Sequence, residues 1–236
     1  MMAIRGVLFD KDGTLIEMDG LWVPVIKEMV AEQFGAGPTE VTARLEPAGY
    51  DAETDTFLAG SVLAAGTTQQ LVAVLWPQLN EAAVQQKAKL LSAALVHKST
   101  NRVKALMPLH DVFDELHALG LRLGIATNDS EGSALSHVAH LGIEHYFVDV
   151  IGFDGVDVPK PSGQMIARFA EKTGLHPSEI AMVGDNTHDL EEARNGGAGL
   201  AIGVLSGNGS HEDIAHLADH VLGSIADLPA LLRKLT

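Results

Sequence analysis

The hydrophobic positions follow two different patterns along the chain, and the change from one to the other predicts how the chain is organised. An apolar stretch at residues 4–9 closes with Val-Leu-Phe and ends abruptly at Asp10, and such runs suit strands buried on both faces of a parallel sheet. Beyond residue 107, short apolar runs alternate with segments of helical periodicity. The runs lie at 121–126, 146–152, 180–183, 200–204 and 220–222, and helices are expected at 109–119, 132–141 and 161–173. This alternation predicts an α/β fold with a doubly wound, Rossmann-like parallel sheet and right-handed crossovers.

Residues 21–104 lack a convincing strand and show helical periodicity instead. Helices are predicted at 21–34, 39–49 and 67–76, each stopped by Gly or Pro, and from residue 81 onward, where Asn80 can act as the N-cap. We therefore expect an all-α insertion of residues 17–104 within an α/β core formed by residues 1–16 and 105–236. An insertion directly after the first strand would overhang the carboxyl end of that strand, as a cap or lid does.

Composition and charge narrow the classes of function. The chain has 236 residues, 46% of them hydrophobic, no cysteine, and a formal net charge of −15. Without cysteine there is no disulfide and no thiolate metal site, and the acidic balance argues against general binding to nucleic acid or to an anionic membrane surface. No window approaches the roughly 18 apolar residues of a membrane-spanning helix, and the first residues lack the apolar region of a signal peptide. We expect a cytoplasmic protein without nucleic-acid or membrane partners; its oligomeric state stays open.

Four polar stretches stand at or just beyond the carboxyl ends of predicted strands, where open α/β sheets bind their ligands. Carboxylates at the end of a buried strand are costly unless they are paired or bind a cation. Taken alone, each stretch has an ordinary explanation as an Asx turn, a helix N-cap, a solvated lysine or an acid in the first turn of a helix. The stretches are Asp10-Lys11-Asp12-Gly13-Thr14-Leu15, Thr127-Asn128, Lys160-Pro161 and Gly184-Asp185-Asn186-Thr187-His188-Asp189.

In this order and spacing, the four stretches resemble the four motifs of the haloacid dehalogenase-like superfamily, and the resemblance covers nearly the whole chain. The helical insertion after the first motif is similar to the C1-capped branch, and the opening Phe-Asp-Lys-Asp-Gly-Thr-Leu is similar to phosphoglycolate phosphatase-like members. One departure is Glu17, since close relatives usually carry Asp at this position, two residues after the Leu of the first motif. It lies at the expected cap hinge, and the departure bears on the hinge rather than on the chemistry.

The resemblance implies catalytic roles for three residues. Asp10 would be the nucleophile that forms an aspartyl-phosphate, and Asp12 would protonate the leaving oxygen and later activate water. Lys160 would neutralise the phosphate and restrain Asp10.

The resemblance also implies a phosphate site and a magnesium site. Thr127 and the amide of Asn128 would hydrogen-bond the phosphoryl group, together with Lys160. Mg²⁺ would take hard oxygen ligands, supplied by Asp10, the backbone carbonyl of Asp12 and Asp185, with Asp189 as a ligand or close by.

A Mg²⁺-dependent phosphatase that acts on a small phosphorylated metabolite, with phosphoglycolate as the nearest likeness, is therefore the function that the sequence favours. A sugar-phosphate mutase similar to beta-phosphoglucomutase and a non-catalytic binding module on the same fold remain alternatives. A dehalogenase needs neither Asp12 nor a metal, and a phosphonatase would lack an Asp at that position, so both are disfavoured.

Two features have more than one interpretation. His188 is expected to be a structural or rim histidine rather than an acid or base, because Asp12 already fills that role. Residues 82–110 contain no acid and five bases, of which Lys98 and Arg102 lie nearest the second hinge. Either this basic stretch, residues 87–104, is a solvated face with an apolar stripe turned inward, or these two cations attract a second anionic group of the substrate. The expected stripe consists of Val84, Ala88, Leu91 and Leu95.

Overall fold

A six-stranded parallel sheet forms the centre of the computed structural model, which describes residues 3–235. The strand order is β5-β4-β1-β6-β7-β8, so the first strand of the chain lies in the middle. The order reverses at β1, as the doubly wound prediction requires. The strands are β1 (Gly6–Phe9), β4 (Arg122–Ala126), β5 (Phe147–Ile151), β6 (Ile180–Gly184), β7 (Leu200–Val204) and β8 (His220–Leu222).

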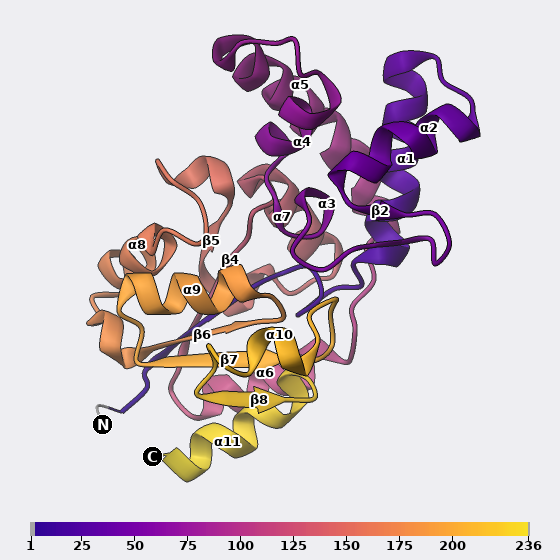
Figure 1. The fold of residues 1–236 in the computed structure, drawn as a ribbon. Helices are drawn as coiled ribbons and strands as arrows, with labels where there is room; N and C mark the ends of the chain where they lie inside the picture. The colour runs from indigo at the N-terminus through magenta and orange to yellow at the C-terminus, as the bar shows by residue number, and fades with distance from the viewer. Residues whose placement is uncertain (1–2, 236) are drawn as a thin grey trace.

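Helices cover both faces of this sheet (Figure 1). Because side chains alternate along a strand, Val7 and Phe9 of β1 pack into one hydrophobic cluster and Leu8 packs into another. The first cluster receives α6 (Leu109–Ala118), α7 (Glu131–His140) and α11 (Leu228–Leu235). The second receives α8 (Gln164–Thr173), α9 (Thr187–Gly196) and α10 (His211–Ile214). Burial on both faces explains why the strands read as continuous apolar runs, and the α/β fold class is confirmed.

The segment between β1 and α6 gathers at one end of the molecule, away from the end where the chain termini lie (Figure 1). Its helices start and stop close to the predicted positions, and Asn80 caps the longest one by accepting a hydrogen bond from the Ala83 amide at 3.0 Å. They are α1 (Asp19–Phe34), α2 (Pro38–Leu45), α3 (Val62–Ala65), α4 (Thr68–Leu75) and α5 (Glu81–Ser99). No helix within residues 3–235 is long and apolar enough to cross a membrane.

The inserted segment is not purely helical, which corrects one expectation. A short antiparallel hairpin pairs β2 (Tyr50–Asp51) with β3 (Thr56–Phe57). Two-residue strands have no periodicity that a sequence pattern could show. A second correction concerns α8, which begins at Gln164 rather than near residue 161. Gly163 precedes it with φ +88°, a left-handed conformation that prevents the helix from starting earlier.

The two backbone segments that connect the inserted segment to the core run side by side and are hydrogen-bonded to each other. The Glu17 amide donates to the Lys104 carbonyl at 3.0 Å, and the Leu106 amide donates to the Leu15 carbonyl at 3.0 Å. These paired segments support a hinge between a core of residues 1–16 and 105–236 and a cap of residues 17–104. The division itself stays a prediction, and Met1, Met2 and Thr236 lie outside the described residues.

Two cations of the basic stretch, Lys98 and Arg102, form ion pairs with another helix of the inserted segment. The Lys98 ammonium lies 2.6 Å from a carboxylate oxygen of Glu28 and 2.8 Å from one of Glu32, and Arg102 contacts Glu28 at 2.9 Å. Both acids belong to α1. The apolar side of α5 is turned inward, as the solvated-face interpretation predicts. In this structure Lys98 and Arg102 bind acids of α1, and their attraction of a substrate anion stays a prediction. The stripe residues that are buried are Ala88, Leu91 and Leu95.

Candidate active site

The sheet brings three of the predicted motifs to one edge. β1 pairs with β4 on one side and with β6 on the other, so Asp10, Thr127 and Asp185, each directly after one of these strands, lie at neighbouring strand ends. The Asp10 amide continues the ladder by donating to the Val183 carbonyl at 2.8 Å, and the Thr127 amide donates to the Ile151 carbonyl at 2.9 Å. The backbone of the sheet therefore holds the first residue of each motif.

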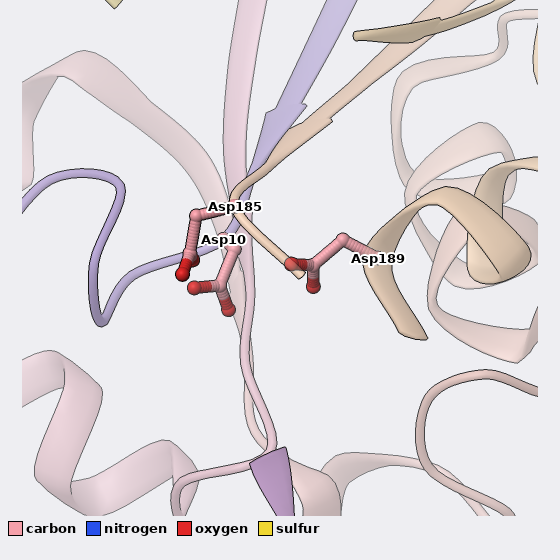
Figure 2. A group of neighbouring side chains, drawn as sticks. All are labelled: Asp10, Asp185 and Asp189. Atoms are coloured by element: carbon pink, nitrogen blue, oxygen red, sulfur yellow. The ribbon is translucent and has the colours of Figure 1, made fainter. Parts of the chain in front are cut away.

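Three buried carboxylates converge at this edge (Figure 2). Asp10 and Asp185 follow strands, and Asp189 enters from the first turn of α9. Each offers a carboxylate oxygen, and these oxygens all lie within 4.8 Å of one another. Such a cluster of like charges is unfavourable without a cation among or beside them.

Lys160 is one such cation. Its ammonium lies 2.6 Å from Oδ1 of Asp10 and 2.6 Å from Oδ1 of Asp189, with no side-chain exposure. Burial lowers the pKa of Lys160, but the two carboxylates outweigh it and hold that pKa above its usual value. Burial raises the pKa of Asp10 to about 6, although Lys160 opposes the rise. Lys160 thus stays charged and fixes the position of the Asp10 carboxylate.

One cation does not balance three buried carboxylates. Burial, with Asp10 and Asp189 adding to it, raises the pKa of Asp185 well above its ordinary value. A hard divalent cation among these oxygens would relieve the repulsion, and carboxylate oxygen is the ligand type that Mg²⁺ prefers. The donor set therefore fits the magnesium ion that the sequence motifs imply.

The turn after β1 needs a glycine because Asp185 occupies the space beside it. Gly13 has φ +81°, and a Cβ at this residue would lie 2.7 Å from Oδ2 of Asp185. The Thr14 hydroxyl donates to Oδ1 of Asp185 at 3.3 Å. From the loop after β7, the Asn208 amide donates to Oδ2 at 3.1 Å, and the Asn208 side chain donates to the Phe57 carbonyl of the inserted segment at 3.0 Å. Asn208 thus touches both parts of the chain, a role that its sequence context did not indicate.

Asp12 lies in a second, separate network. Its Oδ2 contacts the Lys11 ammonium at 2.7 Å, and its Oδ1 accepts a hydrogen bond from the Trp22 indole at 2.6 Å. Lys11 is only 1% exposed and also forms an ion pair with Asp129 at 3.1 Å. Burial raises the pKa of Asp12, but Lys11 and the Trp22 indole together outweigh burial and hold this pKa below its usual value. Asp12 is therefore ionised, and the direction of its pKa shift is opposite to that of Asp10 and Asp185.

The third acceptor for Lys11 is a buried histidine. Nδ1 of His137 lies 3.3 Å from the ammonium, and Nε2 lies 2.8 Å from the Ser99 hydroxyl of α5. Because an ammonium only donates, Nδ1 must accept, so the ring proton is on Nε2 and points to Ser99. Burial, with Lys11 adding to it, lowers the pKa of His137 to about 3, and the ring is neutral.

Thr127 and Asn128 lie where the motif predicts, and both are buried. The Thr127 hydroxyl accepts from the Asp129 amide at 3.1 Å, which is an ordinary turn contact. The Asn128 side-chain amide donates to the Ala65 carbonyl at 2.9 Å and to the Lys160 carbonyl at 3.3 Å, so it connects the inserted segment to the Lys160 loop. Asp189 likewise has a structural contact, because its Oδ2 accepts from the Asn186 amide at 3.0 Å in a capping box.

His188 stands at the rim of the site. Its Nε2 lies 3.5 Å from Oδ1 of Asp189, and its side chain is 15% exposed. Burial, with Lys160 adding to it, lowers the pKa of His188 to about 3. A neutral ring in contact with the cluster agrees with the structural or rim interpretation.

These groups open onto a cavity of about 80 Å³ between the sheet edge and the inserted helices. The core lines it with polar and charged residues, which are Asp10, Asp12, Thr127, Asn128, Asp129, Asp185, Asn186 and His188. The rest of the lining comes from the inserted segment and is mostly apolar, with Trp22 and Phe57 among its residues. The cavity therefore combines a charged end, where phosphate chemistry can take place, with an uncharged end.

A comparison with protein families matches one family over most of the chain. The model described as haloacid dehalogenase-like hydrolase matches residues 4–197, which include every residue of the charged cluster.

Individual relatives are similar over nearly the same range. The chain is 29% identical over 228 residues to a phosphoglycolate phosphatase of Vibrio vulnificus, covering 95% of this chain and 94% of that one. It is 31% identical over 120 residues to the pyrophosphatase PpaX of Bacillus velezensis, covering 51% of this chain and 56% of that one. A crystal structure described as a predicted phosphoglycolate phosphatase from Haemophilus somnus superposes with a TM-score of 0.73 at 21% identity, over 98% of this chain and 99% of that one. At this identity the superposition bears on the fold alone.

Proposed function

Because the chain belongs to the haloacid dehalogenase-like hydrolase family, we propose that it is a Mg²⁺-dependent phosphatase that hydrolyses a small phosphate monoester through an aspartyl-phosphate on Asp10. One observation carries the proposal: Asp10 is held by Lys160 beside Asp185 and Asp189, while Asp12, two residues on, is held separately by Lys11 and Trp22. Two carboxylates in different environments can take different roles in one reaction.

In the first step, Asp10 attacks phosphorus. The bond from phosphorus to the ester oxygen breaks, the new bond joins phosphorus to a carboxylate oxygen of Asp10, and the departing alkoxide takes a proton from Asp12. In the free protein Asp12 is ionised. The negative phosphoryl oxygens raise its pKa when the substrate arrives, so it can carry that proton.

In the second step, Asp12 takes a proton from water as the water attacks the phosphorus of the aspartyl-phosphate. Inorganic phosphate leaves and the Asp10 carboxylate is restored. Throughout both steps Lys160 keeps the Asp10 carboxylate in place and adds positive charge beside the phosphoryl oxygens. Thr127 and Asn128, at the end of β4, are proposed to bind those oxygens on the opposite side.

Asp10, Asp185 and the backbone carbonyl of Asp12 are proposed to hold Mg²⁺, with Asp189 as a further ligand or as the partner of Lys160. When bound, the ion supplies positive charge that offsets the charge of the phosphate and the carboxylates.

Hydrolysis fits the cavity better than the mutase alternative does. A mutase must bind a second phosphoryl group, but no lysine or arginine is among the described residues that line the cavity. A non-catalytic module would have no need of three buried carboxylates, which are costly to maintain. The names of the relatives make phosphoglycolate the first metabolite to test. The cytoplasmic location stays a prediction.

The test is phosphate release by the purified chain from p-nitrophenyl phosphate and phosphoglycolate. EDTA should abolish turnover and Mg²⁺ should restore it. Asp10→Asn should abolish both turnover and any phosphoenzyme trapped by rapid quench, whereas Asp12→Asn should lower kcat by about 10²–10⁴-fold, as loss of a positioned proton donor does. Asp157→Asn, at an exposed carboxylate, is the matched control. Full activity in EDTA, or in Asp10→Asn, would refute the mechanism.

A further inference from the structure

We propose that the substrate's leaving group is compact and apolar and carries no second anionic group. This inference rests on the proposed phosphatase function and names the class of ester that the same site selects: the phosphate of a small apolar alcohol.

The wall opposite the carboxylates is built from apolar side chains of the inserted segment. Ile26 of α1 and Leu71 of α4 contribute to it. Helix α3 is entirely apolar, with the sequence Val-Leu-Ala-Ala, none of its residues is buried, and all of them line the cavity. Contact with a ligand would explain why this short helix carries only apolar side chains and leaves all of them partly exposed.

The cations nearest the cavity already have partners. Lys160 pairs with Asp10 and Asp189, and Lys11 pairs with Asp12 and Asp129. Neither lysine is among the lining residues, and none of the described residues that do line the cavity is Lys or Arg. A carboxylate or second phosphate on the leaving group would meet no opposite charge.

Some polar groups of the wall are engaged within the protein. At the start of α4 a capping box occupies two amides: the Thr67 hydroxyl accepts from the Gln70 amide at 3.3 Å, and the Gln70 side chain accepts from the Thr67 amide at 2.8 Å. The Trp22 indole N–H donates to Asp12. A charged leaving group would therefore lose hydration without meeting an opposite charge, whereas an apolar one would replace water on an apolar wall.

The cavity volume limits the size of this group. The cavity measures about 80 Å³, which favours a small leaving group beside the phosphoryl group. Isobutyl phosphate is a suitable probe, because it replaces the carboxylate of phosphoglycolate with an isopropyl group of similar shape and both leaving groups are primary alcohols.

The experiment compares kcat/KM for isobutyl phosphate and phosphoglycolate at saturating Mg²⁺. The expected ratio in the wild-type protein is at least about tenfold in favour of isobutyl phosphate, the size of discrimination that a small apolar pocket gives. Leu63→Lys places a cation in the wall at a half-buried residue of α3 and should lower this ratio by about tenfold or more. Leu90→Lys, at a leucine of α5 that is 67% exposed, should leave the ratio unchanged.

Each outcome separates the two proposals. Faster turnover of phosphoglycolate, or a ratio that Leu63→Lys does not change, overturns the inference about the leaving group and leaves the phosphatase function standing. Turnover of neither ester with Mg²⁺ present refutes the phosphatase function, and the inference falls with it. If turnover is observed, it must be lost in Asp10→Asn; turnover that survives this change takes place at a different site and also overturns the inference.

Discussion

Asp10 and Asp12 are separated by one residue, yet their surroundings push their pKa values in opposite directions. Burial raises the pKa of Asp10 to about 6, while Lys11 and Trp22 hold that of Asp12 below its ordinary value despite its burial. The difference arises because the buried strand end places Asp10 beside Asp189 as well as Lys160, while the turn directs Asp12 toward Lys11 and Trp22. The proposed nucleophile and the proposed proton carrier therefore lie in different surroundings within a single turn.

Lys160 allows a test at the scale of one side chain. Lys160→Ala removes the cation from Asp10 and from the site of the phosphoryl oxygens, so kcat should fall by about 10²–10³-fold, the loss typical for one preorganised electrostatic group. KM should rise by less, because the charge acts on the nucleophile as well as on the bound ester. Steady-state kinetics at saturating Mg²⁺ measures both.

The control for Lys160 is Lys172→Ala, at an exposed lysine of α8, with circular dichroism showing that both variants are folded. An unchanged kcat in folded Lys160→Ala would contradict the catalytic role and leave Lys160 with a purely structural one.

Among the elements, α1 has an unusual position because it contacts Asp12 and also binds the long helix α5 of the inserted segment. Trp22 donates to Asp12, and Glu28 on the same helix binds Lys98 and Arg102 of the long cap helix and its end. Helix α1 therefore connects Asp12, the proposed acid–base residue, to the rest of the inserted segment. Movement of α1 would remove a hydrogen bond from Asp12.

Trp22→Phe tests this connection, because it deletes the indole N–H and keeps an aromatic ring. A hydrogen bond to a charged group contributes about 1.5–3 kcal/mol, so kcat should fall about tenfold or more if the bond holds Asp12 in its working position. Trp76→Phe is the matched control, since Trp76 packs against Phe34 away from the site. Equal kinetics in the two variants would show that Asp12 needs no support from α1.

At the scale of the whole molecule, several of the polar contacts that join the sheet to the inserted segment within residues 3–235 end at a site residue or its neighbour. Asn208 joins Asp185 to Phe57, Asn128 joins the Lys160 loop to Ala65, and His137 joins Lys11 to Ser99. The contacts that hold the inserted segment on the sheet therefore also hold residues of the site.

The buried His137 predicts how global stability depends on pH. Its pKa of about 3 in the folded protein lies below the value of about 6.5 in the unfolded chain. Between these values the unfolded chain binds a proton that the folded protein does not, so stability falls as pH decreases from about 6.5 toward 3, by about 1.4 kcal/mol per pH unit for this one group. Above pH 6.5 the group contributes no pH dependence.

Urea unfolding between pH 5 and 7.5 measures this slope. Glutamine is neutral throughout, so His137→Gln should reduce this slope by the contribution of one proton, about 1.4 kcal/mol per pH unit. His97→Gln, at an exposed histidine, should leave the slope unchanged. The same slope in His137→Gln as in the wild-type protein would mean that another group causes the loss of stability in acid.

The sequence by itself determined the sheet, its surrounding helices and the edge at which the charged residues gather. Strand and helix periodicities depend on near neighbours in the chain, and parallel strands place their carboxyl ends at one edge, so Asp10, Thr127 and Asp185 could be assigned to one site before any contact was known. The hairpin at β2 and β3 was missed because its strands are too short to carry a period.

Tertiary structure alone decided which side chains serve the site and which do not. Lys11 looked like an ordinary residue between two aspartates, and Trp22 like one more apolar position of a helix, but packing buries both against Asp12. Lys98, by contrast, looked free to reach the crevice and is bound to Glu28. Ion pairs and hydrogen bonds between residues far apart in sequence depend on how whole elements pack, and no local pattern of polar and apolar positions encodes that packing.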